Sequence, residues 1–200
     1  MQTLEIARRT DGAIVGLDVN PAFLTQLEEA AHRAQVAGRI QTVRQSMLTM
    51  DFPPASFDLI WAEGSIYIIG FAEGLRQWRS LLTSGGYLAV THVTWLTRSI
   101  PEEAATFWDR EYPAITTIDR NLEIARATGY EEVGHFALPA SAWWDDYYTP
   151  MEARLKLLRE EYRGDDPALA ILRESQEEIE LYQRHSAAYG YVFYILQRRD

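Results

Sequence analysis

Cysteine is absent from the 200 residues, and lysine occurs once, at Lys156. The lack of cysteine excludes a disulfide framework and catalysis by a thiol, and it fits a reducing cytoplasm, which we predict as the compartment. Acidic residues outnumber Lys and Arg by 29 to 19, which gives a formal net charge of −10. A chain with this charge has little electrostatic attraction to nucleic acid or to an anionic membrane.

Long apolar runs and metal-binding motifs are missing as well. No run approaches the ~18 apolar residues that suggest a membrane-spanning helix. The four histidines lie far apart, and no spacing typical of metal ligands occurs. We therefore predict no metal site, no nucleic-acid partner and no membrane span.

The first half of the chain alternates short apolar runs with amphipathic stretches. Strands are predicted at 13–17, 39–44, 57–62 and 87–93, and a turn is predicted at 84–86. Asn20 and Pro21 open a predicted helix that ends before Gly38, and a second helix is predicted at 74–82. Strands that are apolar without alternation suit a mostly parallel sheet covered on both faces. The pattern predicts a Rossmann-like, doubly wound α/β fold.

The second half is rich in aromatic residues and is predicted to complete the same sheet. Helices are predicted at 101–112, 119–128, 151–162 and 167–188, and strands at 132–138 and 191–196. Because no linker separates the halves, we predict a single domain over residues 1–200. Its helical cover lies at about 97–128 and 140–188, and its last strand is antiparallel.

Ligands of a doubly wound sheet bind beyond the carboxyl ends of its strands, so the residues that follow the strands matter most. Asp18 ends the first apolar run. An acid at such a place accepts hydrogen bonds from the hydroxyls of a ribose. The plainer interpretation is an acid that interacts with the dipole of the next helix. Further candidates follow the other strands, at 45–48, 63–67 and 92–95.

Three segments, at 13–21, 50–60 and 81–90, together resemble the class I S-adenosylmethionine-dependent methyltransferases. The nearest likeness is to the group that acts in ubiquinone and menaquinone biosynthesis. Residues 61–67 and 189–195 are similar to uncharacterised bacterial members, so the resemblance spans nearly the whole chain. It implies S-adenosyl-L-methionine as the cofactor and methyl transfer as the reaction.

The resemblance also implies roles for individual residues. Asp18 would hold the ribose, and Ser46 takes the place of an aspartate that contacts the adenine in many members. Glu63 and Gly64 would lie beside the methionine end of the cofactor. The cofactor-binding residues implied in this way are Asp18, Val19, Asn20, Ser46, Met47, Leu48, Glu63 and Gly64.

Few catalytic groups are expected, because the enzyme mainly aligns the acceptor with an activated methyl group. Glu63 and Tyr67 are candidates on the acceptor side, and His92 is the best candidate for a general base. Their structural alternatives are a helix-start acid, a packing tyrosine and a hydrogen-bonded core histidine. Several aromatic residues either pack in the core or line a pocket for an apolar or aromatic small-molecule acceptor: Trp95, Trp108, Tyr112, Trp143, Trp144, Tyr147 and Tyr148.

The resemblance does not extend to the segment before Asp18. A glycine-rich loop is expected about 20 residues before the acid, whereas only 17 residues precede Asp18, and 2–9 has the pattern of the helix that follows such a loop. Either the chain is the carboxyl portion of a longer protein, or the strands on the two sides of the gap pair directly. We expect this chain to bind the cofactor weakly, and tight binding in calorimetry would contradict that. Open strand edges also make a homodimer an expectation.

Two other functions remain open at this point. A protein of the same fold that has lost the cofactor would act as a binding or assembly module. An NAD-dependent dehydrogenase would use Asp18 equally well. The segment 56–60 and the pair Gly85 and Gly86 favour methyl transfer by resemblance.

Overall fold

The computed structural model describes residues 2–200. The chain forms two compact units, Met1–Pro53 and Pro54–Asp200. The described part of unit 1 contains a two-stranded sheet, and unit 2 contains a sheet of five strands. The mixed α/β architecture and the antiparallel last strand are confirmed. Residues 14–18 and 57–62, which flank the expected gap, belong to separate sheets.

Unit 1 is a parallel pair of strands packed against a helix. Its elements are α1 (Gln2–Arg9), β1 (Ile14–Asp18), α2 (Pro21–Arg33), the short 3-10 turn η1 (Ala37–Arg39) and β2 (Ile40–Arg44). Asn20 caps α2, because its side-chain oxygen accepts a hydrogen bond from the backbone N–H of Ala22 (3.0 Å). The left-handed residue after α2 is Gln35 (φ 57°), and the predicted end at Gly38 is too late.

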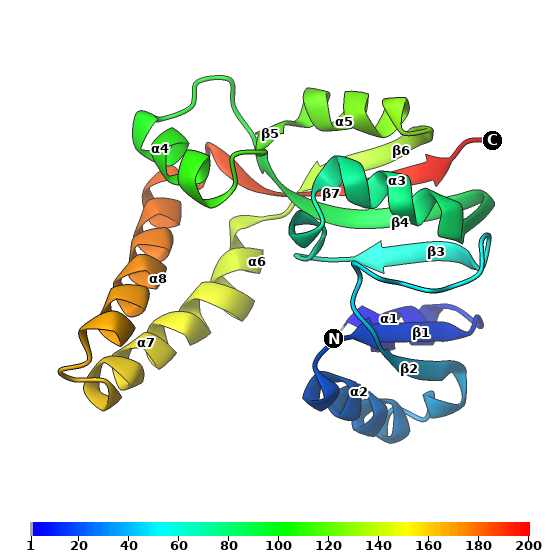
Figure 1. The fold of residues 1–200 in the computed structure, drawn as a ribbon, viewed down its shortest axis with the longest axis horizontal. Helices are drawn as coiled ribbons and strands as arrows, with labels where there is room; N and C mark the ends of the chain where they lie inside the picture. Colours follow the sequence, from blue (N-terminus) through cyan, green and yellow to red (C-terminus); the bar gives the residue numbers. More distant parts are fainter. Residues whose placement is uncertain (1) are drawn as a thin grey trace. The chain divides into compact units, whose positions relative to one another are not determined.

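Unit 2 contains the remaining elements, which Figure 1 shows in the order of the chain. They are β3 (Phe57–Ala62), η2 (Ile66–Ile68), α3 (Phe71–Leu81), β4 (Leu82–Trp95), α4 (Glu102–Glu111), β5 (Thr116–Thr117), α5 (Ile118–Ala127), β6 (Tyr130–Ala137), α6 (Ala140–Trp143), η3 (Trp144–Tyr148), α7 (Thr149–Glu161), α8 (Asp166–His185) and β7 (Tyr189–Arg198). The strand order is β3-β4-β7-β6, and β5 pairs with the end of β4.

The predicted turn at 84–86 lies inside β4. Leu82 pairs with Phe57, but Tyr87 pairs with Leu59, so β4 uses extra residues to pass the same stretch of β3. Gly85 has φ +72°, a left-handed conformation that costs little without a Cβ. The double glycine therefore forms an irregularity within one strand, since residues on both sides of it keep pairing with β3.

The sheet of unit 2 is fully covered on only one of its faces. Helices α3 and α5 pack on the first face, where Leu88, Val90 and Leu196 are fully buried (Figure 1). On the second face, a depression of about 490 Å³ is lined almost entirely by apolar side chains. Trp61 in this depression is 42% exposed. The expectation of a sheet covered on both faces holds only in part.

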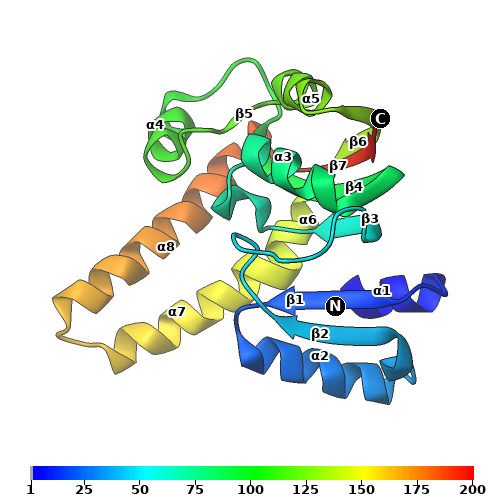
Figure 2. The ribbon, with the colours of Figure 1, turned by 45° about the vertical axis from the view of Figure 1, so that its right-hand side comes forward.

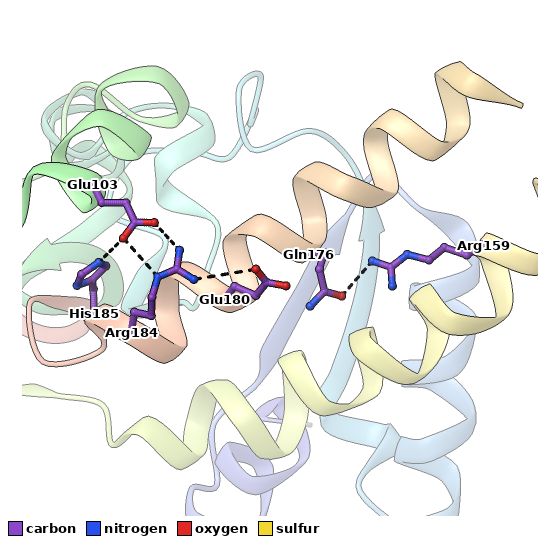
Figure 3. A network of polar contacts seen from close by, with 6 residues as sticks. All are labelled: Glu103, Arg159, Gln176, Glu180, Arg184 and His185. Atoms are coloured by element: carbon purple, nitrogen blue, oxygen red, sulfur yellow. Dashed lines mark hydrogen bonds and ion pairs between the residues drawn. The ribbon is translucent and has the colours of Figure 1, made fainter.

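Helices α7 and α8 form an antiparallel pair that extends from the sheet of unit 2 (Figure 2). Arg159 of α7 donates a hydrogen bond to the side chain of Gln176 of α8 (3.1 Å). Near the end of α8, Arg184 and His185 both contact the carboxylate of Glu103 in α4, as Figure 3 shows. The Arg184 guanidinium holds the pKa of Glu103 below its usual value. These contacts attach α4 to the carboxyl end of α8.

A buried polar network attaches α5 to the first face of the sheet. The side-chain N–H groups of Asn121, which is 1% exposed, donate to the hydroxyl oxygens of Thr94 (3.2 Å) and Tyr194 (3.0 Å). Replacing Asn121 by alanine removes both bonds, so we expect it to lower the free energy of unfolding by about 2 kcal/mol. Urea denaturation measures this value. Glu123→Ala on the exposed side of α5 is the control, and an equal loss in both variants would contradict the prediction.

Candidate functional site

A candidate site in unit 1 lies at the carboxyl ends of β1 and β2. Because the two strands are parallel and Asp18 pairs with Arg44, their ends meet at one edge. The backbone N–H of Gln45 donates to the carbonyl oxygen of Asp18 (3.1 Å). The structure thus brings the segment after β1 and the segment after β2 together, as the sequence predicts.

The side chains at this edge suit an adenosyl group. One carboxylate oxygen of Asp18 accepts the N–H of Asn20 (2.8 Å), and within residues 2–200 the other oxygen accepts no hydrogen bond. Val19 and Leu48 expose 60% and 51% of their surface beside it. An acceptor for a ribose hydroxyl and apolar side chains for the adenine ring therefore occur together.

Ser46 and Met47 complete the loop that follows β2. The Ser46 hydroxyl oxygen accepts the backbone N–H of Leu48 (3.2 Å), which folds the loop into a turn. A hydroxyl oxygen has two lone pairs, so Ser46 keeps one acceptor position for a further hydrogen bond. Met47 is half-buried in the same turn.

In unit 2, further sequence-predicted residues follow the carboxyl end of β3. The Glu63 carboxylate accepts a hydrogen bond from the Trp61 indole N–H (2.6 Å). Gly64 has φ +58°, and its N–H donates to the Thr91 hydroxyl (2.8 Å). The Tyr191 hydroxyl lies 3.9 Å from the point that a Cβ at Gly64 would occupy. The left-handed turn at Gly64 is therefore attached to β4 and lies near Tyr191 of β7.

Tyr67 and His92 occupy contrasting positions near this end. Tyr67 is 48% exposed in η2, and its ring meets the edge of the Tyr112 ring at 6.4 Å. His92 is 1% exposed, and its ring stacks on Phe71 at a centroid distance of 4.6 Å. Burial lowers the pKa of His92 to about 4, so the imidazole is neutral at neutral pH. Tyr67 is accessible to an acceptor, while His92 is enclosed by aromatic rings.

Sequence reasoning missed Thr91, Tyr191 and Glu178. The period of two in β7 places Tyr189 and Tyr191 on one face, but only the antiparallel register puts Tyr191 opposite Val93 and near Gly64. Glu178 lies in a charged stretch of α8 that is typical of a solvated helix face. Its side chain is instead half-buried and accepts a hydrogen bond from Tyr148 (3.0 Å).

The predicted aromatic cover divides into core and surface. Trp95 was expected to follow the strand. It is instead the last residue of β4, and it is 7% exposed. Trp143 and Tyr148 are buried as well, whereas Tyr147 is 45% exposed. Within residues 2–200, no three His, Asp or Glu side chains gather in a way that could hold a metal ion. None of the helices in that range is long and apolar enough to cross a membrane.

Comparisons with known proteins agree with this geometry. Residues 1–86 match the family model described as a methyltransferase domain. No curated protein matches the chain.

Three solved structures illustrate the likeness in fold. A methyltransferase from Geobacter sulfurreducens in complex with S-adenosyl-L-homocysteine has a TM-score of 0.74 at 17% identity, over 99% of this chain and 90% of that chain. One from Thiobacillus denitrificans with the same ligand has a TM-score of 0.74 at 18% identity, over 98% and 80%. The [4+2]-cyclase SpnF has a TM-score of 0.70 at 20% identity, over 98% and 70%. At these identities the likeness establishes the fold.

Proposed function

We propose that this chain is a class I S-adenosylmethionine-dependent methyltransferase and that it transfers a methyl group to a small-molecule acceptor. The domain match over residues 1–86 and the likeness in fold support this proposal. Bound S-adenosylmethionine supplies a methyl group that its sulfonium sulfur has already activated. The protein therefore has to bind the cofactor, align the acceptor and exclude water.

The position of Asp18 is the observation that carries this proposal. Its carboxylate keeps one oxygen for a ribose hydroxyl at the carboxyl edge of a parallel strand pair. Val19 and Leu48 offer exposed apolar surface to the adenine, and Asn20, Ser46 and Met47 fix the two loops. We assign the adenosyl part to these residues of unit 1, and the resemblance to methyltransferases assigns the methionine part to Glu63 and Gly64.

The residues around Gly64 take the acceptor side. Tyr67 exposes nearly half of its surface, so its hydroxyl can donate to or accept from an acceptor group. Glu63 is held by Trp61 and supplies a carboxylate that can accept a proton. His92, the other base that the sequence suggests, is 1% exposed and enclosed by Phe71 and Tyr112, so Glu63 is the better candidate for this role.

A melting experiment tests the cofactor class. S-adenosyl-L-homocysteine at about ten times its Kd is expected to stabilise the chain by about 1.4 kcal/mol. This corresponds to a rise in Tm of about 3–6 °C for a protein of this size. Because binding is expected to be weak, the ligand is titrated into the millimolar range, and NADH at equal concentration is the control.

The three possible results separate the candidate functions. A rise with S-adenosyl-L-homocysteine alone supports the proposal. A rise with NADH alone contradicts it in favour of a dehydrogenase. No rise with either compound contradicts it in favour of a binding or assembly protein.

A further inference from the structure

Six aromatic residues of unit 2 form a continuous cluster that the cofactor does not explain. This aromatic cluster joins α6, η3 and α8 to the amino-terminal end of β7, and it consists of Trp143, Tyr147, Tyr148, Tyr182, Tyr189 and Tyr191. The Trp143 ring stacks on Tyr182 and on Tyr191, both at centroid distances of 4.7 Å, and on Tyr148 at 5.4 Å. The face of an aromatic ring carries negative electrostatic potential, which favours a cation. Tyr147, which is 45% exposed, and the half-buried Tyr191 are the rings of the cluster that solvent reaches.

A carboxylate lies at one side of the aromatic cluster. Glu178 of α8 accepts a hydrogen bond from the buried Tyr148 hydroxyl (3.0 Å). Burial raises the pKa of Glu178, and the negative charge of Glu111 adds to the effect. Among residues 2–200, Arg, Lys and His form no ion pair with Glu178, and Arg184 of the same helix pairs with Glu103 and Glu180 instead. The carboxylate thus has a neutral hydrogen-bond donor but lacks a counter-ion.

Burying a carboxylate without a cation costs free energy, because the carboxylate loses part of its hydration. A hydrogen bond from a neutral hydroxyl makes up for only part of that loss. The phenols beside it stay neutral, since burial raises the pKa of Tyr147 and of Tyr191 to about 12. An accessible neutral ring and a carboxylate together match one ligand chemistry, an alkylammonium group, which the Tyr147 ring contacts with its face and the Glu178 carboxylate neutralises.

We propose that Glu178 and the aromatic cluster bind the ammonium group of a cationic small-molecule acceptor. This inference rests on the proposed function, which it extends by naming the class of acceptor. Tyr147 is 45% exposed and Glu178 is half-buried, so a small cation reaches both from solvent. Tyr191 connects the aromatic cluster to Gly64, the residue assigned to the methionine end of the cofactor.

The test compares a quaternary ammonium probe with its neutral isostere. Choline and 3,3-dimethylbutan-1-ol have nearly the same shape, but only choline is charged. Tryptophan fluorescence reports binding, because Trp143 lies in the aromatic cluster. In the wild-type chain, choline is expected to bind about tenfold more tightly than the alcohol.

Glu178→Gln removes the charge and keeps an oxygen that accepts the Tyr148 hydrogen bond. In this variant the preference for choline is expected to disappear, while the affinity for the alcohol stays within about twofold. Glu174→Gln, at an exposed position of the same helix, is the matched control and should keep the wild-type preference. Tyr147→Leu, which removes an exposed ring, should reduce the preference.

Equal affinities of choline and the alcohol in the wild-type chain would overturn the inference, as would a preference that survives Glu178→Gln. S-adenosyl-L-homocysteine is titrated separately into the same samples. Its failure to bind counts against the proposed function alone, whereas a missing preference for charge counts against the ammonium site alone.

Discussion

Replacing Asp18 by alanine is expected to weaken the binding of S-adenosyl-L-homocysteine by about 10- to 100-fold. A hydrogen bond to a charged group is worth roughly 1.5–3 kcal/mol, and each 1.4 kcal/mol is a factor of ten in Kd. The Asp18 carboxylate keeps one oxygen available for such a bond. Isothermal titration calorimetry on the wild type and the variant measures the ratio of the two Kd values.

A second substitution at Asp18 separates binding from local folding. Asp18→Ala also removes the acceptor for the Asn20 N–H, which shapes the loop before α2. Asp18→Asn keeps an oxygen for that N–H but loses the charge and the second acceptor. We expect it to bind S-adenosyl-L-homocysteine nearly as weakly as the alanine variant does. Wild-type affinity in Asp18→Asn would assign Asp18 to the turn, and Asp11→Ala, at an exposed acid of unit 1, should bind like the wild type.

Acid is expected to destabilise the protein through His92. The pKa of His92 falls from 6.5 to about 4 on folding, because burial opposes the charged imidazolium. Below pH 6.5 the unfolded chain binds a proton at this residue that the folded chain does not bind. The contribution of His92 to the free energy of unfolding is therefore fully present above pH 6.5, and it is lost as the pH falls towards 4. The loss is about 2 kcal/mol at pH 5 and about 3 kcal/mol at pH 4.

The variant His92→Leu lacks the imidazole that binds this proton. Comparing it with the wild type isolates the contribution of His92 to the pH dependence of stability. Carboxylates also titrate in the acid range, so the informative quantity is the difference between wild type and variant in the free energy of unfolding, measured by urea denaturation at several pH values. This difference should change by about 2 kcal/mol between pH 7 and pH 5. His32→Gln, at an exposed position of α2, controls for the loss of a histidine as such. Parallel pH profiles for wild type and His92→Leu would contradict the prediction.

Local sequence signals predicted most of the elements. The strand at 57–62 agrees with the prediction at both ends, and Asn20 caps α2 as its side chain suggests. Gly129 has φ +87° just after α5, as a helix-ending glycine requires. Such signals depend on neighbours along the chain, so one sequence suffices to read them. Gly85 and Gly86 misled the prediction, because a glycine pair suits a turn and a strand irregularity equally well.

The sequence by itself determined the α/β class, the strand ends at which a ligand is expected and the carboxylate at the end of β1. These follow from apolar patterning and from the direction of parallel strands, which bring their carboxyl ends together. Only the tertiary structure decided that His92 is enclosed by Phe71 and Tyr112, and that Glu178 contacts Tyr148. The burial and the pKa of a side chain depend on groups that are far apart in the sequence. Which face of a helix is covered is decided only when the helix packs against other elements.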